Sequence, residues 1–170
     1  MKIKHLLFAS AVVATMVLGS CQRHFITDKS VRDSVHEAFE ARRANFTQGD
    51  VFSVFDGEGM TYEERGAMEF LYSAMSSADM GDYEGEYFLD NVRMSLRARD
   101  EMAWGKDIPE DLFRHFVLPV RVNNERMDEF RMIYYDTLRT RVEGMSLHDA
   151  ALEINHWCHE KATYVPSDSR

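Results

Sequence analysis

Apolar residues recur at helical spacing along most of the chain after residue 29. Hydrophobic positions three or four apart mark one face of an amphipathic helix. Six helices are expected on this pattern, over about 30–46, 61–78, 82–104, 107–118, 124–142 and 146–162. Between the first two, the apolar insert 51–55 is expected to form either a short helix or a docked hydrophobic turn. No segment alternates as a half-buried strand does, so we predict an all-α fold of about six helices in an irregular bundle.

Short polar residues stand where several of these helices should begin. Ser30, Thr61 and Ser146 each precede an acidic residue by three positions, which is the spacing of a capping box. Asn124 is expected to cap the fifth helix, and Gly144 is expected to end it. These signals agree with the apolar pattern on where the helices lie.

The N-terminus has the pattern of an export signal. Lys2 and Lys4 precede an uncharged, mostly apolar run from Leu6 to Leu18. As a helix this run would be roughly 20 Å long, against about 30 Å of bilayer hydrocarbon, so it is too short to span a membrane comfortably. A positive start followed by a short apolar run is typical of a secretory signal peptide.

The run ends in Leu18-Gly19-Ser20-Cys21, which resembles the lipobox of bacterial lipoproteins. The resemblance implies that residues 1–20 are removed and that Cys21 carries acyl chains. An ordinary secretory signal that happens to end at a cysteine is the alternative. Two or more acyl chains hold a protein firmly on a bilayer. We therefore expect an exported protein anchored in the cell envelope, at the outer membrane because Gln22 rather than Asp follows the cysteine.

The remaining composition fits one domain behind a short connection. Residues 21–28 are expected to form a lipidated tether, and residues 29–170 the helical domain. The formal charge of −9 becomes more negative by two without residues 1–20, which hold two lysines and no acidic residue. Such a surface disfavours nucleic acid and gives no electrostatic attraction to anionic lipid. The expected contact with the membrane is therefore the N-terminal lipid, and no nucleic-acid partner is expected.

Cys158 is the only other cysteine, so an acylated Cys21 would leave it without a disulfide partner. With His156 and His159 beside it, it could be a nucleophile. Reactive thiolates usually lie at a helix N-terminus or in an electropositive cleft, whereas Cys158 lies near the far end of its helix. We interpret it as a small core residue on the apolar side of that helix. The other members of that side are Leu147, Ala150, Ala151, Ile154, Trp157 and Ala162.

Two residue pairs have the i, i+3 spacing of carboxylate-bridged metal sites in helix bundles. They are Glu153 with His156, and Asp33 with His36. Such sites need two further carboxylates on facing helices, and His156 with His159 would supply only half of a zinc site. A polar helix surface with local charge pairs explains these residues more simply. We therefore expect no metal and no other cofactor.

Three aromatic residues, Trp104, Tyr134 and Tyr135, could line a ligand groove. Helical spacing already accounts for most aromatic residues of the chain, so we favour core packing for these three.

A polar group follows Pro119 between two expected helices. It consists of Arg121, Asn123, Asn124 and Glu125. This stretch resembles one in bacterial transglutaminase-like proteins that leads into the catalytic half, and the resemblance implies that the group could contact that half. The alternative is a helix cap with charged neighbours.

Residues 112–164 resemble a segment of bacterial transglutaminase-like proteins, which belong to the papain-like superfamily. The most distinctive part is Ala-Leu-Glu-Ile-Asn-His-Trp-Cys-His-Glu-Lys at 151–161, and the similarity extends back through Leu-Pro-Val-Arg-Val-Asn-Asn-Glu at 118–125. In that family the segment lies just before the catalytic cysteine, which stands in a Gly-x-Cys-Gly setting and is followed by a His and an Asp. No position of this chain matches those residues. The resemblance therefore implies a helical region that precedes an α+β catalytic half and has no catalytic residue of its own.

Two functions are compatible with these residues. In the first, the chain is the membrane-anchored N-terminal part of a transglutaminase-like lipoprotein. The family's cysteine-dependent acyl transfer or hydrolysis at peptide and glutamine amides would then imply a peptide or protein substrate, if the catalytic half is present. In the second, the chain is a complete, non-enzymatic helical lipoprotein that binds or scaffolds a partner. The first predicts an exposed apolar patch on the helix 146–162, and the second predicts that this helix is well covered.

Overall fold

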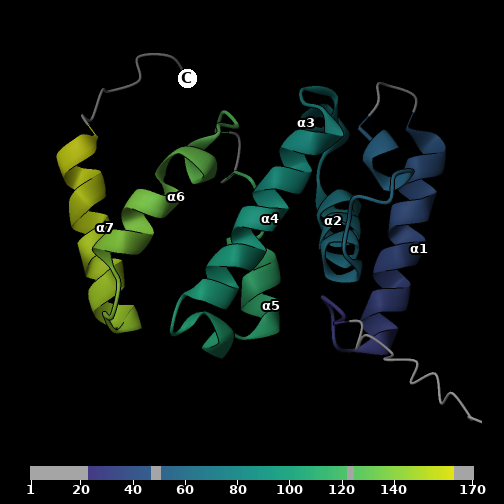
Figure 1. Ribbon diagram of the computed structural model, residues 1–170. Helices are drawn as coiled ribbons and strands as arrows, with labels where there is room; N and C mark the ends of the chain where they lie inside the picture. Colours follow the sequence, from purple (N-terminus) through teal and green to yellow (C-terminus); the bar gives the residue numbers. More distant parts are fainter. Residues whose placement is uncertain (1–22, 47–50, 122–124, 163–170) are drawn as a thin grey trace, which may run out of the picture.

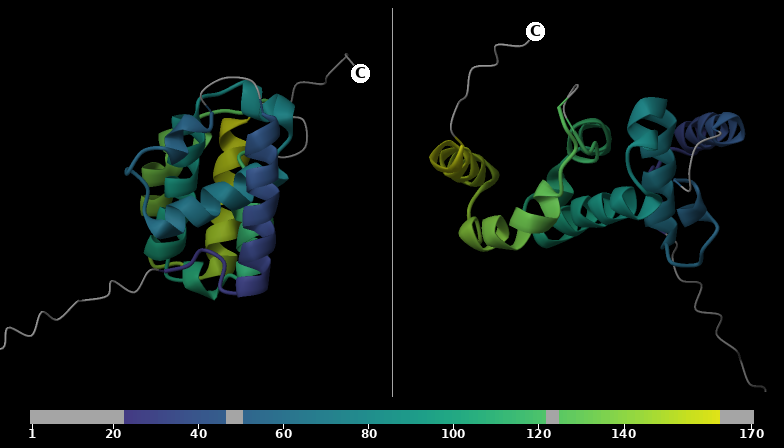
Figure 2. Two further views of the ribbon diagram at one scale, coloured as in Figure 1. Left: turned by 90° about the vertical axis from the view of Figure 1, so that its right-hand side faces the viewer. Right: turned by 90° about the horizontal axis from the view of Figure 1, so that it is seen from above.

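The computed structural model describes residues 23–46, 51–121 and 125–162. These residues form α-helices and short helical turns with no strand, so the predicted all-α class is confirmed. The helices lie in an elongated row with α1 at one end and α7 at the other (Figures 1 and 2). In chain order they are α1 (Lys29–Asn45), α2 (Tyr62–Ala74), α3 (Ser77–Gly81), α4 (Gly85–Glu101), α5 (Glu110–Leu112), α6 (Phe130–Arg141) and α7 (Leu147–Lys161).

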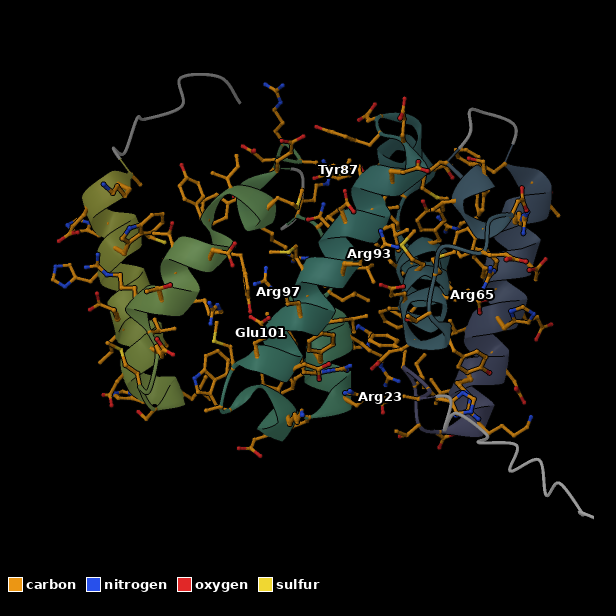
Figure 3. All side chains as sticks on the ribbon, viewed as in Figure 1. Arg23, Arg65, Tyr87, Arg93, Arg97 and Glu101 are labelled. Atoms are coloured by element: carbon orange, nitrogen blue, oxygen red, sulfur yellow. The ribbon has the colours of Figure 1, made fainter. Side chains whose placement is uncertain are left out.

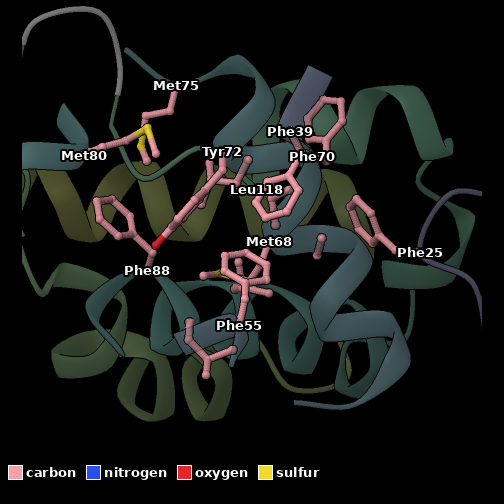
Figure 4. Packing of buried hydrophobic residues seen from close by; sticks show 14 of the residues in the cluster. Phe25, Phe39, Phe55, Met68, Phe70, Tyr72, Met75, Met80, Phe88 and Leu118 are labelled. Carbon is pink, nitrogen blue, oxygen red and sulfur yellow. The ribbon is translucent and has the colours of Figure 1, made fainter. Parts of the chain in front are cut away.

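A core rich in aromatic side chains holds α1, α2 and α4 together (Figure 4). Tyr72 of α2 lies at its centre, with its ring centroid 5.3 Å from that of Phe52 and 5.6 Å from that of Phe88. Its hydroxyl donates a hydrogen bond of 2.9 Å to the carbonyl of Val51, and burial raises the pKa of this phenol. Because a buried hydroxyl needs a partner, this bond fixes where the chain after residue 50 meets the core.

The apolar insert 51–55 combines the two forms expected for it. It contains a short 3₁₀ turn, η1 (Ser53–Phe55), and its side chains Val51, Phe52 and Phe55 are buried in the core. The ring of Phe55 packs 4.7 Å from that of Phe39 on α1, centroid to centroid. The insert therefore closes one side of the core.

Two of the three predicted capping boxes begin helices as expected. The Thr61 hydroxyl accepts from the Glu64 amide at 3.1 Å while the Glu64 carboxylate accepts from the Thr61 amide at 2.6 Å. Ser146 caps α7, with its hydroxyl 3.2 Å from the amide nitrogen of Asp149. Gly144, expected to end the preceding helix, adopts a φ of 75°, which favours glycine.

The predicted cap of the first helix was wrong by two residues. Asp28, not Ser30, is the N-cap of α1, because its carboxylate accepts from the Ser30 amide at 2.7 Å. The Ser30 hydroxyl donates to the same oxygen at 2.7 Å and, with the backbone amides, lowers the pKa of Asp28. An ionised cap also interacts favourably with the positive end of the helix dipole.

The residues just before α1 are part of the fold. Phe25 and Ile26 fall within the stretch expected as a tether, yet both side chains are buried in the main core. The backbone amide of Thr27 donates to the carboxylate of Glu110 at 3.0 Å. Arg32 donates to the carbonyls of Ile26 and Thr27, at 2.7 Å each. The segment 23–28 is therefore held by both apolar burial and hydrogen bonds.

Tertiary packing shortens the expected second and third helices. α2 ends at Ala74, and residues 77–81 form a separate short helix, α3, capped by the Ser76 hydroxyl. α4 begins at Gly85 rather than at residue 82 and ends at Glu101 rather than near 104.

The expected helix 107–118 is shorter and changes type partway. α5 leads directly into a π-helical turn, η3 (Phe113–Val117). In an α-helix, residues five apart point about 140° away from each other. Here the Leu118 amide donates to the Phe113 carbonyl at 2.9 Å, and this i, i+5 bond defines the wider turn. Both Phe113 and Leu118 are consequently buried in the core.

The expected fifth helix also begins later than its pattern suggested. α6 starts at Phe130, and Asn124, the expected cap, lies outside the described residues. Residues 125–128 form no helix, and Met127 is buried in the core. The hydroxyls of Tyr83 and Tyr87 donate to the carbonyls of Met127 and Asp128, at 3.0 and 2.9 Å. Bonds from these two tyrosines therefore replace the first helical turn.

Substituting Gly85 tests how closely the insert 51–55 approaches α4. A Cβ at Gly85 would lie 2.7 Å from the Val51 carbonyl oxygen, while a Cβ at Gly59 would meet nothing within 4 Å. We expect Gly85→Ala to lower the free energy of unfolding by about 1–3 kcal/mol, because overpacking forces the backbone apart. Gly59→Ala is the control and should leave it almost unchanged. Equal urea midpoints for the two variants would contradict this close approach.

Candidate functional site

α6 and α7 form an arm that shares little of the main core, and we call residues 130–161 the C-terminal arm. α6 has no fully buried residue, and α7 has only Ala150 and Trp157. The Trp157 ring lies 5.2 Å from that of Tyr134, centroid to centroid, and Arg141 forms an ion pair with Glu153. α7 is therefore attached through α6, at the end of the row away from α1 (Figure 2).

One line of apolar residues along α7 is left partly uncovered. Its members follow each other by four, three and four residues, so they lie on one side of the helix. We call this line the α7 stripe: Leu147, Ala151, Ile154 and Cys158. Leu147 is 51% exposed, Ala151 is exposed, and Ile154 and Cys158 are half-buried. The sequence predicted these residues to be core, and that prediction was wrong for Leu147, Ala151 and the exposed Ala162, since α6 covers only the side that carries Ala150 and Trp157.

Further large apolar side chains are exposed on and beside the arm. Ile133 is 57% exposed and Leu152 58%, while Phe116 of the π-helical turn is 79% exposed. Apolar surface of this kind commonly marks an interaction site. The arm therefore carries the candidate functional surface.

Cys158 lies on the predicted side of its helix and has a free thiol. Among the described residues no hydrogen bond links this thiol to a base, and its neighbour His156 instead lies 3.8 Å from Glu160, between Nε2 and Oε1. A thiol at this distance from the helix N-terminus gains nothing from the helix dipole.

The two candidate metal pairs lie at opposite ends of the molecule, on α1 and α7 (Figure 1). Each also has other partners. Glu153 pairs with Arg141, and His36 Nδ1 lies 3.1 Å from Glu69 Oε2. Within the described ranges, no three His, Cys, Asp or Glu side chains are grouped closely enough to hold a metal ion.

The segment between η3 and α6, residues 118–129, is called the linker, and the polar group after Pro119 connects it to α3. Arg121 forms an ion pair with Asp79 and donates to the carbonyl of Glu125 at 2.9 Å. Asn123 and Asn124 lie outside the described residues. A groove of about 570 Å³, which we call the linker groove, lies beside Arg121, with His115, Phe116, Glu125 and Phe130 among the residues that line it.

The three candidate groove aromatics, Trp104, Tyr134 and Tyr135, are half-buried, and none of them lines the linker groove. Tyr135 instead connects α6 to α4. Its hydroxyl donates to the Glu101 carboxylate at 3.0 Å. Burial, followed by this bond, raises the pKa of Tyr135 to about 12.

Charged residues surround the Tyr135 contact, and two of them, Arg97 and Glu101, lie close together on α4 (Figure 3). Arg97 of α4 donates to Glu101 at 2.8 Å and to Asp136 of α6 at 2.9 Å. Its guanidinium carbon lies 4.6 Å from the ring centroid of Tyr135. Hydrogen bonds from Arg97 and then Tyr135 lower the pKa of Glu101. This exposed network orients α6 along α4.

Arg131 is the residue that sequence reasoning missed. It donates to the carbonyls of Val117, Leu118 and Pro119 at 2.7, 3.2 and 2.5 Å, and to the Ser95 hydroxyl at 2.8 Å. These carbonyls belong to the last residue of the π-helical turn and to the two residues after it, where carbonyls lack helical partners. Burial lowers the pKa of Arg131, although an arginine remains charged in proteins. The helical pattern gave no sign of this role, because Arg131 occupies an ordinary polar position.

Comparison with protein-family models, with curated proteins and with solved structures gave no match. In the part of the chain described, none of the helices has the length and apolar character needed to cross a membrane.

Replacing Arg131 should loosen the arm. Arg131→Met leaves three carbonyls and a buried hydroxyl without their donor, so we expect a loss of roughly 2–4 kcal/mol in the free energy of unfolding. Arg126→Met removes an exposed arginine next to α6 and should cost almost nothing. Chemical denaturation followed by circular dichroism measures both. Similar midpoints for the two variants would mean that Arg131 does not carry the attachment.

Alkaline pH should weaken the contact between α4 and α6. The pKa of Tyr135 rises from 10.0 to about 12 in the fold, so its contribution is complete below pH 10 and is lost as pH rises through 12. As pH rises from 10 to 12, the free energy of unfolding should therefore fall less in Tyr135→Phe than in the unsubstituted protein. Urea midpoints measured every half unit from pH 9 to 12 test this, and parallel curves for the two proteins would contradict it.

Proposed function

We propose that this chain is the membrane-anchored helical part of a transglutaminase-like lipoprotein, and that its C-terminal arm packs against a catalytic α+β module. The chain itself performs no catalysis in this proposal. It orients the module and holds it near the membrane. The family chemistry, cysteine-dependent acyl transfer or hydrolysis at peptide or glutamine amides, would act on a peptide or protein substrate.

The uncovered α7 stripe is the observation that carries the proposal. On the side of α7 away from α6, Leu147 and Ala151 are exposed and Ile154 and Cys158 are half-buried, and such a side suits a second packing partner. Each large aliphatic side chain that is buried on docking contributes about 1.5–3 kcal/mol. The stripe is therefore able to stabilise a protein interface, whereas apolar surface left in water does not stabilise an isolated domain.

The position of the family resemblance supports the same partner. The similarity covers residues 112–164, which include the π-helical turn, the linker and the whole arm. The well-packed core lies largely in the earlier helices, where the resemblance is loose. The resembling segment is thus the part of the chain with the most apolar surface left to cover, as expected if it evolved to pack against the family's catalytic half.

The lipid anchor is the second part of the proposal. Leu18-Gly19-Ser20-Cys21 supports acylation of Cys21 after removal of residues 1–20, with the outer membrane as the destination. An acidic chain has no electrostatic attraction to anionic lipid, so the acyl chains would supply the attachment.

A non-enzymatic binding or scaffold lipoprotein is a second candidate, and the linker groove favours it. The groove combines the exposed ring of Phe116 with polar groups of Arg121 and Glu125. A mixed lining of this kind suits a peptide segment, with apolar contacts for affinity and polar groups for orientation.

The experiment joins the chain to the module that it is proposed to hold. Genomic DNA after codon 170 is expected to encode, in some frame, a Gly-x-Cys-Gly motif followed by a His and an Asp. The joined lipoprotein should release ammonia from a glutamine peptide or cleave it. Ala151→Glu places a charge on the α7 stripe and should lower this activity at least about tenfold, the equivalent of 1.4 kcal/mol.

His148→Glu adds the same charge on another side of α7 and serves as the matched control. Neither substitution should change the stability of the present chain, because Ala151 and His148 are both exposed. The proposal fails if no such motif is encoded downstream, or if both variants of the joined protein keep full activity.

A further inference from the structure

The start of the described chain is fixed to one end of the molecule. Arg23 Nη1 lies 3.2 Å from Asp100 in the last turn of α4, and Arg23 Nε lies 3.1 Å from Glu63 in the first turn of α2. The side chains of Phe25 and Ile26, which follow, are buried in the core. Figure 3 places Arg23 at one end of the molecule and Tyr87, near the start of α4, towards the other.

Cys21, the residue expected to carry lipid, precedes the fixed Arg23 by only two positions. Consecutive Cα atoms are 3.8 Å apart, so the Cα of Cys21 lies within about 8 Å of the Cα of Arg23, whatever the conformation between them. The acyl chains must enter the hydrocarbon. The end of the domain that holds Arg23 is therefore confined to the membrane surface.

The loop 102–109 lies at the same end, although it is far from Cys21 in sequence. Asp100, in the last turn before the loop, and Glu110, directly after it, both contact the first described segment, Asp100 through Arg23 and Glu110 through the amide of Thr27. The loop carries Trp104, which is half-buried, and Lys106, which is exposed. Tyr62, beside His24 with ring centroids 4.8 Å apart, is 45% exposed at this end as well. Tyrosine and tryptophan are the residues that most favour the boundary between lipid and water.

We propose that the domain stands end-on at the bilayer, with Tyr62 and the loop 102–109 against the lipid headgroups. The orientation is set by the shortness of the connection between Cys21 and the fixed residues that begin at Arg23, and no basic patch is needed. This inference rests on the proposed acylation of Cys21 but does not depend on the proposed catalytic partner.

The end-on orientation also determines how the C-terminal arm faces the membrane. α1 and α7 run roughly along the direction from the anchored end to the opposite end (Figures 1 and 2). In this orientation α7 rises from the membrane, and its stripe faces along the surface. A module docked there would sit beside the domain, at the level of the membrane, and not above it.

Fluorescence quenching by lipid tests the orientation. The acylated protein, with Cys158→Ser, carries one fluorophore on a cysteine at position 106 or at position 84. Glu84 is exposed at the start of α4, about 24 Å along the helix from Asp100. In vesicles of phosphatidylcholine and phosphatidylethanolamine with a nitroxide on the headgroup, the label from Lys106→Cys should be strongly quenched. The label from Glu84→Cys should keep its full intensity.

A lengthened connection is the control. A flexible Gly-Ser insert of about 12 residues after Gln22 has a mean span of roughly 20 Å and should remove most of the quenching at position 106. Equal quenching at positions 106 and 84 without the insert would overturn the end-on orientation. Unchanged quenching at 106 with the insert would overturn the role of the short connection.

Mass spectrometry of the membrane-extracted protein tests acylation of Cys21 separately from the end-on orientation. A mass without acyl chains on Cys21 overturns the anchor and this orientation together, but leaves the docking of a catalytic module to its own test. An acylated mass with equal quenching overturns the orientation alone.

Discussion

The guanidinium of Arg131 connects the two parts of this molecule. It reaches from α6 to the three carbonyls at the end of the π-helical turn, those of residues 117 to 119, and to Ser95 on α4. A buried cation without a carboxylate is costly unless dipoles replace its hydration. Here the negative end of a helix, with unpaired carbonyls, supplies them. Because the four acceptors come from two separate elements, one side chain sets how α4, the turn and α6 meet.

This attachment explains why the arm differs from the rest of the fold. α1, α2 and α4 are held by buried aromatic rings, and the insert 51–55 closes that core. The arm is held mainly by polar contacts, namely those of Arg131 and the network around Glu101, while tyrosine bonds hold residues 127 and 128 just before it. Hydrogen bonds fix orientation while burying little apolar surface. The arm can therefore be well placed and still leave the α7 stripe open to a partner.

Two parts of the molecule then have different tasks in the proposed function. The end of the domain that holds Arg23 receives the lipid, through a connection too short to let the domain turn freely. The C-terminal arm, at the end of the row away from α1, presents its apolar stripe to a catalytic module beside the domain. Because the helices between them share one continuous body, the anchor would fix the height and direction at which the module meets the membrane. This arrangement would restrict the enzyme to substrates close to the envelope surface.

The sequence alone determined the helical class, the six main apolar stretches and two helix starts, at Thr61 and Ser146. These features are local, since helical spacing and capping need only neighbouring residues. Tertiary structure decided the rest. The shift to a π-helical turn lets both Phe113 and Leu118 face the core. Met127 is buried in a non-helical segment that stands in place of the first turn of the expected helix 124–142, and Phe25 and Ile26 are drawn into the fold. An apolar residue at helical spacing shows that it could be buried, but only the position of the neighbouring helix decides whether it is. For that reason Ala150 and Trp157 are covered, while Leu147 and Ala151 on the same helix are not.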